Sequence, residues 1–457
     1  MKFKSRRRSY RKPRRPLPLP IILMAIPLVL ISLELLARIF VGFAGKSAEL
    51  AAYEGQPALA TAYDLKFLGQ SQQPYDGIFD RGRLAAQRQF GMGYSLVGKQ
   101  KSQYWGINEQ GFRDNDPLPL AKPKNEIRIF LLGGSTAFSQ WSASNQATLA
   151  SKLETRLNER IAQQKRTPEK YRPTTLPYFK TELDKAIRLP LRLRDGQYRV
   201  INAAVPGYTS GNELAQLALQ ILPYSPDAIV VLDGYSDLML PSQQAATDIP
   251  HTEAFLNNAS GHFWTTLTQQ LKHAITGTYF VKAIQYWLLR PEPNVSQTSL
   301  IATENAAPLE QHLAANPGEL DSRVARYRTH QAQMVRLTTG AGIPMLLALQ
   351  PEITGRGTTK LSPKEQAILK ELKPSYKQEV ETGYAELAQA SEQLQKAFPK
   401  NVKTLNFYKF YEKFSKPAFY DTVHLTEEAN TALAEQFYRV ITSLPKLQVT
   451  PPKPPGQ

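Results

Sequence analysis

The hydrophobic positions of the chain form short apolar runs that are separated by amphipathic stretches. Five runs have the length and the Val-, Ile- and Leu-rich content of buried strands. Because strands and helices alternate, the pattern predicts a three-layer α/β/α domain around a five-stranded, mostly parallel sheet. The predicted strands cover Ile127–Leu132, Tyr198–Ala203, Ala228–Leu232, Pro344–Leu349 and Val402–Leu405.

The stretches between these runs predict the helices, because their apolar residues recur three or four positions apart. Residues 362–397 are rich in Glu, Lys and Gln and predict a long helical region. Asp321 and Thr426 are expected to cap the helices on either side of it. The periodic apolar positions are Leu149, Leu153 and Leu157, then Leu214, Leu217 and Ile221, then Val324, Tyr327, Met334 and Leu337, and finally Ala429, Leu433 and Phe437.

The longest apolar run lies near the N-terminus, over residues 17–43. About 20 apolar residues cross a bilayer core, so this run predicts a transmembrane helix. Glu34 and Arg38 are one helical turn apart and are expected to pair near its far end. Residues 1–16 hold nine Lys or Arg and no acid, which favours a cytoplasmic N-terminus. The rest of the chain is then expected outside the plasma (inner) membrane.

A cleaved signal peptide is the main alternative to this single-pass anchor. Such a peptide needs a shorter apolar core and a small-x-small cleavage site, which Phe43-Ala44-Gly45 fits poorly. Arg6-Arg7-Arg8 resembles a twin-arginine export signal, which on its own is weak. An uncleaved anchor is therefore the preferred interpretation.

Four further regions lie outside the predicted strand and helix repeat. Residues 44–125 are expected to be a linker and lead-in to a catalytic domain over 126–445. Helical insertions are expected near 165–197 and 240–320, the second with an aromatic stripe that includes Phe263, Trp264, Phe280 and Trp287. The Pro-rich tail, 446–457, is expected to be disordered.

Composition excludes several classes of function. The net charge of +17 falls to +8 without residues 1–16, and no basic-aromatic motif accompanies it, so no nucleic-acid partner is expected. The absence of Cys excludes disulfides and thiolate chemistry. The six His are scattered, and no phosphate-binding Gly-rich loop is present, so neither a metal nor an organic cofactor is expected.

Three motifs at predicted strand ends carry candidate chemistry. Gly133-Gly134 after the first strand permits a sharp turn that exposes Ser135, although Ser135 is equally suited to cap the next helix. Gly207 after the second strand offers a backbone N–H to an oxyanion, or is a plain turn glycine. After the third strand, Asp233-Gly234-Tyr235-Ser236-Asp237 places polar side chains at the same sheet edge.

The fourth motif is Asp421-Thr422-Val423-His424, just before the last predicted helix. An Asp three positions before a His can accept from one imidazole nitrogen while the other nitrogen faces a serine. An isolated Asp-x-x-His more often lies on a loop without a catalytic role. Its value here comes from its place in the chain, after the three strand-end motifs.

In this order the four motifs resemble those of the SGNH/GDSL hydrolase superfamily, over about residues 105–445. The resemblance implies an SGNH/flavodoxin-like fold, with Ser135 as nucleophile, His424 as base and Asp421 as its partner. It implies an oxyanion hole from Ser135, Gly207 and Ser236. Asn108-Glu109-Gln110-Gly111-Phe112-Arg113 also looks like the lead-in of membrane-anchored bacterial members.

Two positions depart from the family pattern. Gly134 stands where many members carry Asp, and Ser236 stands where the family has an oxyanion-binding Asn. A hydroxyl also donates one hydrogen bond, but it is shorter than an amide.

The resemblance implies an extracytoplasmic serine esterase that acts on acyl esters of carbohydrate or cell-envelope, lipid-like material. An O-acyltransferase with the same triad and a catalytically degenerate envelope-binding protein are the alternatives.

Overall fold

The computed structural model describes residues 19–53, 58–69, 82–249, 268, 271, 274–289 and 308–452. The chain divides into two compact units. One combines residues 1–58 with 270–291, and the other combines 59–269 with 292–457. The predicted lead-in and catalytic domain therefore fall mostly in one unit, whereas part of the 240–320 insertion belongs with the N-terminal helix.

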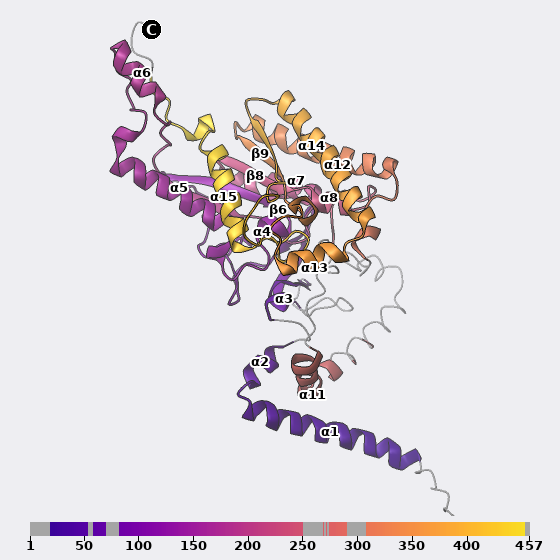
Figure 1. The fold of residues 1–457 in the computed structure, drawn as a ribbon. Helices are drawn as coiled ribbons and strands as arrows, with labels where there is room; N and C mark the ends of the chain where they lie inside the picture. The colour runs from indigo at the N-terminus through magenta and orange to yellow at the C-terminus, as the bar shows by residue number, and fades with distance from the viewer. Residues whose placement is uncertain are drawn as a thin grey trace, which may run out of the picture. The chain divides into compact units, whose positions relative to one another are not determined.

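A five-stranded sheet forms the centre of the larger unit, and all of its strand pairs are parallel (Figure 1). In chain order the strands follow the sequence 2-1-3-4-5 across the sheet, which is the flavodoxin-like arrangement. The predicted fold class and all five strands are confirmed. The strands are β6 (Glu126–Gly133), β7 (Gln197–Asn202), β8 (Ala228–Asp233), β9 (Met345–Leu349) and β10 (Val402–Asn406).

Alternate residues of these strands pack into two separate cores, as the pleat of a strand requires. Ile129 and Val230 face a core that includes Leu153 of α5 (Leu149–Arg166) and Phe437 of α15 (Glu427–Ile441). Phe130 and Val231 face the other core. Its helical residues come from α12 (Pro317–Gly340), the end of α14 (Pro374–Ala397) and the turn Leu217–Ile221 after α7 (Ser210–Gln216).

The lead-in is more than a linker, which corrects the expectation for residues 44–125. Strands β1 (Leu65–Leu68), β2 (Leu84–Gln89) and β3 (Gly93–Leu96) form a three-stranded sheet of their own. A two-stranded ladder, β4 (Gln100–Lys101) with β5 (Gly106–Ile107), follows it. These strands are too short for a periodic pattern to predict. The lead-in buries Tyr63, Tyr94 and Trp105 in the main core, so it is part of the larger unit.

Several helix boundaries differ from those predicted. Helix α12 begins at Pro317, because proline suits the first helical turn. Its cap is Asn316, five residues before the expected cap Asp321. Pro374 divides the region 362–397 into α13 (Pro363–Glu371) and α14. Thr426 caps α15 as predicted, since its side chain accepts from the Ala429 N–H. The 165–197 insertion contains α6 (Lys180–Arg188).

The C-terminal segment was expected to be disordered from residue 446, but its described part, up to residue 452, is fastened to the domain. The Val449 N–H donates to the Arg192 carbonyl at 2.8 Å, and the Arg194 N–H donates to the Leu447 carbonyl at 2.9 Å. Leu447 is fully buried. The apolar side chains between the prolines supply this packing, which a count of prolines does not predict.

The smaller unit is built on α1 (Leu19–Phe43). Its residues Met24–Phe43 are long and apolar enough to cross a membrane, and most of their side chains are exposed. The predicted pair forms, with Arg38 Nε 2.8 Å from Glu34 Oε1. Helices α2 (Ser47–Ala52) and α11 (Tyr279–Ala283) belong to the same unit, and Trp287 packs edge-on against Phe40. The predicted aromatic positions Phe263 and Trp264 lie outside the described residues.

Candidate active site

The glycines before Ser135 shape the turn at the carboxyl end of β6. Gly133 has φ +146°, and a Cβ there would lie 2.2 Å from the Leu232 carbonyl oxygen, so only glycine fits. Gly134 is the N-cap of α4 (Ser135–Phe138), and Ser135 is the first helical residue. The alternative in which Ser135 is a capping residue is therefore wrong, and its hydroxyl is not used to cap α4.

The Asp421–His424 pair is buried, and three donors of the motif are directed at the carboxylate. Asp421 Oδ1 accepts from the His424 N–H at 2.7 Å and the Val423 N–H at 3.0 Å, while Oδ2 bonds to His424 Nδ1. Burial raises the pKa of Asp421, but the attraction of His424 and these hydrogen bonds outweigh it. The net pKa lies below the ordinary value, so Asp421 is a carboxylate.

The other imidazole nitrogen, His424 Nε2, is buried and has no hydrogen-bond partner among the described residues. The loop that carries it lies against the segment of the candidate nucleophile. Thr136, next to Ser135, donates from its hydroxyl to the Val423 carbonyl at 3.2 Å and accepts from Gln350 Nε2 at 2.9 Å. The fold thus brings residues 135–136 and 423–424, nearly 290 positions apart, to one place.

Trp141 is a site residue that the sequence analysis missed. Its indole nitrogen lies 2.8 Å from Asp421 Oδ2 and 2.9 Å from His424 Nδ1. Its ring stands edge-on to the imidazole, with centroids 5.6 Å apart. A lone Trp six residues after the serine belongs to no motif, so only the folded chain reveals the contact.

Gly207 lies in the loop between β7 and α7, with φ +84°. The Tyr94 hydroxyl donates to the Pro206 carbonyl at 2.7 Å, and the Thr247 hydroxyl donates to the Gly207 carbonyl at 3.1 Å. In a trans peptide the C=O and the following N–H point in opposite directions. Tyr94 therefore fixes the direction of the Gly207 N–H, which points away from the tyrosine.

Ser236 lies near the turn that precedes the candidate nucleophile. It occupies the first turn of α8 (Tyr235–Met239), after Gly234 with φ +110°. A Cβ built on Gly134 would lie 3.6 Å from Ser236 Oγ and 3.2 Å from the Tyr208 carbonyl oxygen. The ends of β6, β7 and β8 thus converge, and β6 and β8 flank the switch point where flavodoxin-like sheets bind their ligands.

Glu213, Asp233 and Asp237 form a second group of buried acids. Asp233 accepts from Gln331 Nε2 at 2.6 Å and from the Tyr327 hydroxyl, and Asp237 accepts from the Ser210 hydroxyl at 2.5 Å. No donor among the described residues reaches either carboxyl oxygen of Glu213.

Burial and the neighbouring charges control how these acids titrate. Burial and the adjacent Asp233 raise the pKa of Glu213 well above its ordinary value. Burial and Asp237 raise the pKa of Asp233 to about 7. Burial and the neighbouring carboxyl group thus favour the neutral form of Glu213.

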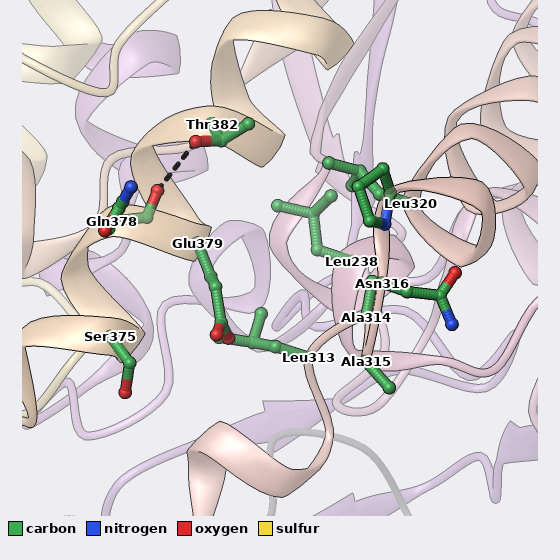
Figure 2. A pocket seen from close by; sticks show the side chains of 11 residues that line it. Leu238, Leu313, Ala314, Ala315, Asn316, Leu320, Ser375, Gln378, Glu379 and Thr382 are labelled. Atoms are coloured by element: carbon green, nitrogen blue, oxygen red, sulfur yellow. Dashed lines mark hydrogen bonds between the residues drawn. The ribbon is translucent and has the colours of Figure 1, made fainter.

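Figure 2 shows a pocket of about 370 Å³ between α8, α12 and α14. Leu238 and Leu320 lie on one side of it, and Ser375 and Gln378 of α14 lie on the other. Neither Ser135 nor His424 is among the residues that line this pocket. Within the described residues, no group of three or more His, Asp or Glu side chains is placed to hold a metal ion.

No family model and no curated protein matches the chain. Among solved structures it is similar to a lipase/acylhydrolase from Enterococcus faecalis, with 13% identity, 72% of this chain and 99% of that chain covered, and a TM-score of 0.34. It is also similar to an acetyl xylan esterase from Geobacillus stearothermophilus, with 11% identity, coverage of 70% and 95%, and a TM-score of 0.33.

A GDSL-like lipase from Bacteroides thetaiotaomicron is similar at 13% identity, coverage of 69% and 88%, and a TM-score of 0.28. These proteins are lipases, acylhydrolases and esterases, the classes to which the sequence motifs pointed. Likenesses at these TM-scores carry no functional weight of their own, so the site must be judged by its geometry.

Proposed function

We propose that the chain is a membrane-anchored serine esterase of the SGNH/GDSL type, with Ser135, His424 and Asp421 as its triad. One observation carries the proposal. A buried imidazole is held by a carboxylate at Nδ1, and its Nε2 has no partner among the described residues. It lies on a loop bonded to the residue after Ser135. A serine needs such a base, because its hydroxyl is a weak nucleophile by itself.

In the proposed reaction, Ser135 Oγ attacks the acyl carbonyl and its proton passes to His424 Nε2. The new C–O bond leaves a tetrahedral oxyanion, while Asp421 stabilises the imidazolium. When the intermediate collapses, the ester C–O bond breaks and the leaving alcohol takes the proton from Nε2. Water then repeats the sequence on the acyl-enzyme and releases the acid and free Ser135.

The oxyanion is proposed to bind the N–H groups of Ser135 and Gly207 and the hydroxyl of Ser236. The left-handed conformation of Gly207 and the Tyr94 bond to Pro206 support a preset direction for the Gly207 N–H. Donors that are held before the reaction need no reorganisation in the transition state, which is the usual source of their large effect.

The ester is proposed to belong to carbohydrate or lipid-like material of the cell envelope, because the proposed topology places the enzyme outside the membrane. In this topology α1 crosses the membrane once, and the nine cations of residues 1–16 stay in the cytoplasm. Protease added to intact spheroplasts should then degrade residues beyond α1. Protection of the whole chain would contradict this orientation.

The first test is labelling of the full-length protein in detergent by a fluorophosphonate probe. The wild type should label, and Ser135→Ala and His424→Ala should not. Ser391→Ala is a matched control, because this buried serine lies on α14 and its hydroxyl donates to the Leu387 carbonyl of the same helix, so labelling should be unchanged. An unlabelled wild type with an intact circular dichroism spectrum would overturn the proposal.

With labelling established, free acid as product would indicate hydrolysis, whereas an acylated acceptor would indicate transfer.

A further inference from the structure

We propose that Trp141 and Arg113 are positioning residues of the triad: Trp141 holds the Asp421 carboxylate, and Arg113 holds the turn that carries Trp141. This inference rests on the proposed function. It gives a role to the Asn108–Arg113 motif, which the catalytic mechanism itself does not use.

The contact of Trp141 with the triad resolves to one hydrogen bond. Its indole N–H lies within reach of both Asp421 Oδ2 and His424 Nδ1. Nδ1 must carry a proton to donate to Asp421, so it cannot also accept from the indole. The indole therefore donates to Oδ2. With the two backbone N–H groups on Oδ1, four donors surround the carboxylate and fix its orientation.

The turn that presents Trp141 is held in an unfavourable backbone conformation. Ser139 has φ +60° and Trp141 has φ +70°, in the left-handed region that non-glycine residues seldom adopt. Such residues persist only when the surrounding structure determines them. Something must therefore stabilise residues 138–145 independently of Trp141.

Arg113 supplies that stabilisation from a buried position. Its Nη1 donates to the carbonyls of Phe138 and Ser139 at 2.9 and 3.0 Å, and its Nε donates to Asn145 Oδ1 at 3.0 Å. Its Nη2 donates to the Tyr63 hydroxyl at 2.7 Å, which itself donates to the Ser142 carbonyl. One guanidinium thus bonds the turn on both sides of Trp141. A lysine ammonium lacks the planar fork that makes these contacts together.

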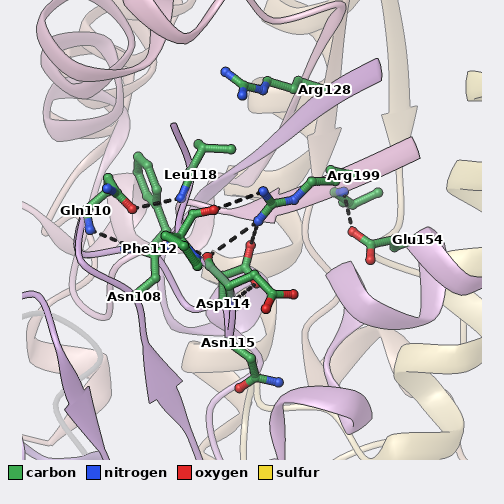
Figure 3. A network of polar contacts seen from close by, with 12 residues as sticks. Asn108, Gln110, Phe112, Asp114, Asn115, Leu118, Arg128, Glu154 and Arg199 are labelled. Carbon is green, nitrogen blue, oxygen red and sulfur yellow. Dashed lines mark hydrogen bonds and ion pairs between the residues drawn. The ribbon is translucent and has the colours of Figure 1, made fainter. Parts of the chain in front are cut away.

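The backbone around Arg113 is fastened on both sides, as the polar network in Figure 3 shows. Asn108 Oδ1 accepts from the N–H groups of Gln110 and Phe112, and Arg199 bonds to Asp114 at 2.6 Å. The Arg113 N–H donates to the Asn202 carbonyl at the end of β7. Through Arg113, the lead-in motif therefore connects β7 to the turn after Ser135 by hydrogen bonds.

The test measures the rate constant of fluorophosphonate labelling against pH for the full-length protein. Trp141→Phe keeps the ring and removes the N–H, so labelling should slow about 10-fold, the worth of one hydrogen bond to a charged group. A carboxylate that has lost the indole donor is more basic. The fall of the labelling rate at low pH, which is the acid limb of the profile, should therefore move to higher pH. A merely structural role for Trp141 would not move that limb.

Trp105→Phe is the matched control. It removes another buried indole donor, whose partner is the Ala62 carbonyl at 2.8 Å, away from the triad. It should lower the melting temperature but leave the labelling rate and its pH profile unchanged. If Trp141→Phe behaves like Trp105→Phe, the role of Trp141 is wrong, although a labelled wild type still supports the proposed function.

Arg113→Lys should reproduce the slower labelling and the shifted limb of Trp141→Phe. Because Arg113 acts through Trp141, the double variant should label within about two-fold of Trp141→Phe alone. Arg128→Lys, at a buried arginine on the distant part of β6, controls for loss of a buried guanidinium. Additive losses in the double variant would overturn the link between Arg113 and Trp141.

Discussion

The Asp421 site and the Glu213–Asp233 cluster are both buried carboxyl sites, yet their acids titrate in opposite directions. Asp421 receives four donors, one of them from an imidazole, and its pKa lies below the ordinary value. Glu213 receives no hydrogen-bond donor from the described residues, and its pKa is raised well above the ordinary value of a glutamate. Burial alone therefore does not decide the charge of an acid; the charges beside it and the donors around it contribute as well.

The two sites should also make stability depend on pH with opposite signs. The lowered pKa of Asp421 stabilises the fold above the pKa of the unfolded chain, and this stability is lost as pH falls through the folded value. The raised pKa values of Glu213 and Asp233 stabilise the fold at low pH. That contribution is lost as pH rises from about 4 through neutrality, where Asp233 titrates at about 7.

The largest effect on the labelling rate should come from removing the negative charge of Asp421. Asp421→Asn cannot stabilise the imidazolium and favours the wrong tautomer, so the fluorophosphonate labelling rate should fall about 10⁴-fold. Glu213→Gln removes a buried carboxyl from the other site and should change labelling less than about two-fold. Equal losses in the two variants would mean that Asp421 has only a structural role.

Adding a donor should have the next largest effect. Ser236→Asn places a longer amide donor near Gly134, where the SGNH pattern expects it. Since loss of one oxyanion donor costs about 10²–10³ in rate, the variant should raise the turnover of a simple acyl ester by about 10-fold or more. The increase should appear in kcat rather than in KM. A slower variant would indicate that the site is built around the serine hydroxyl.

The smallest effect should be on the pH dependence of stability. Glu213→Gln cannot hold the proton that the raised pKa of Glu213 retains in the folded chain, so stability should fall less steeply between pH 5 and pH 8. The slope should change by at most about 1.4 kcal/mol per pH unit, the value for one proton. Melting curves of the full-length protein followed by near-ultraviolet circular dichroism measure it.

Glu154 gives an intermediate comparison for that experiment. Burial raises its pKa to about 7, although it accepts one backbone donor, the Val200 N–H at 2.7 Å. Glu154→Gln should therefore flatten the same pH dependence, but less than Glu213→Gln does. The opposite ranking would show that donor number does not control these carboxyl groups.

The sheet was predictable because buried parallel strands leave continuous apolar runs, and the motif order placed Ser135, Gly207 and Ser236 at strand ends. That they converge depends on the strand order, which the structure supplies. Trp141 and Arg113 could not be assigned, because their partners are 280 positions away or are backbone carbonyls. The short strands β1–β3 and the Asn316 cap were missed because local patterns there are weak.

Under the proposed membrane anchor, the division of the chain into units also determines how the larger unit could be released. Residues 270–291 return to the unit of α1, where the Phe280 N–H donates to Glu34 at 3.0 Å and Trp287 packs on Phe40. A single proteolytic cut near residue 58 would leave the larger unit joined to this returning segment, so its release would require a second cut or dissociation of the packed aromatics. A soluble fragment that begins after α1 would lack Phe40 and expose Trp287, which favours aggregation.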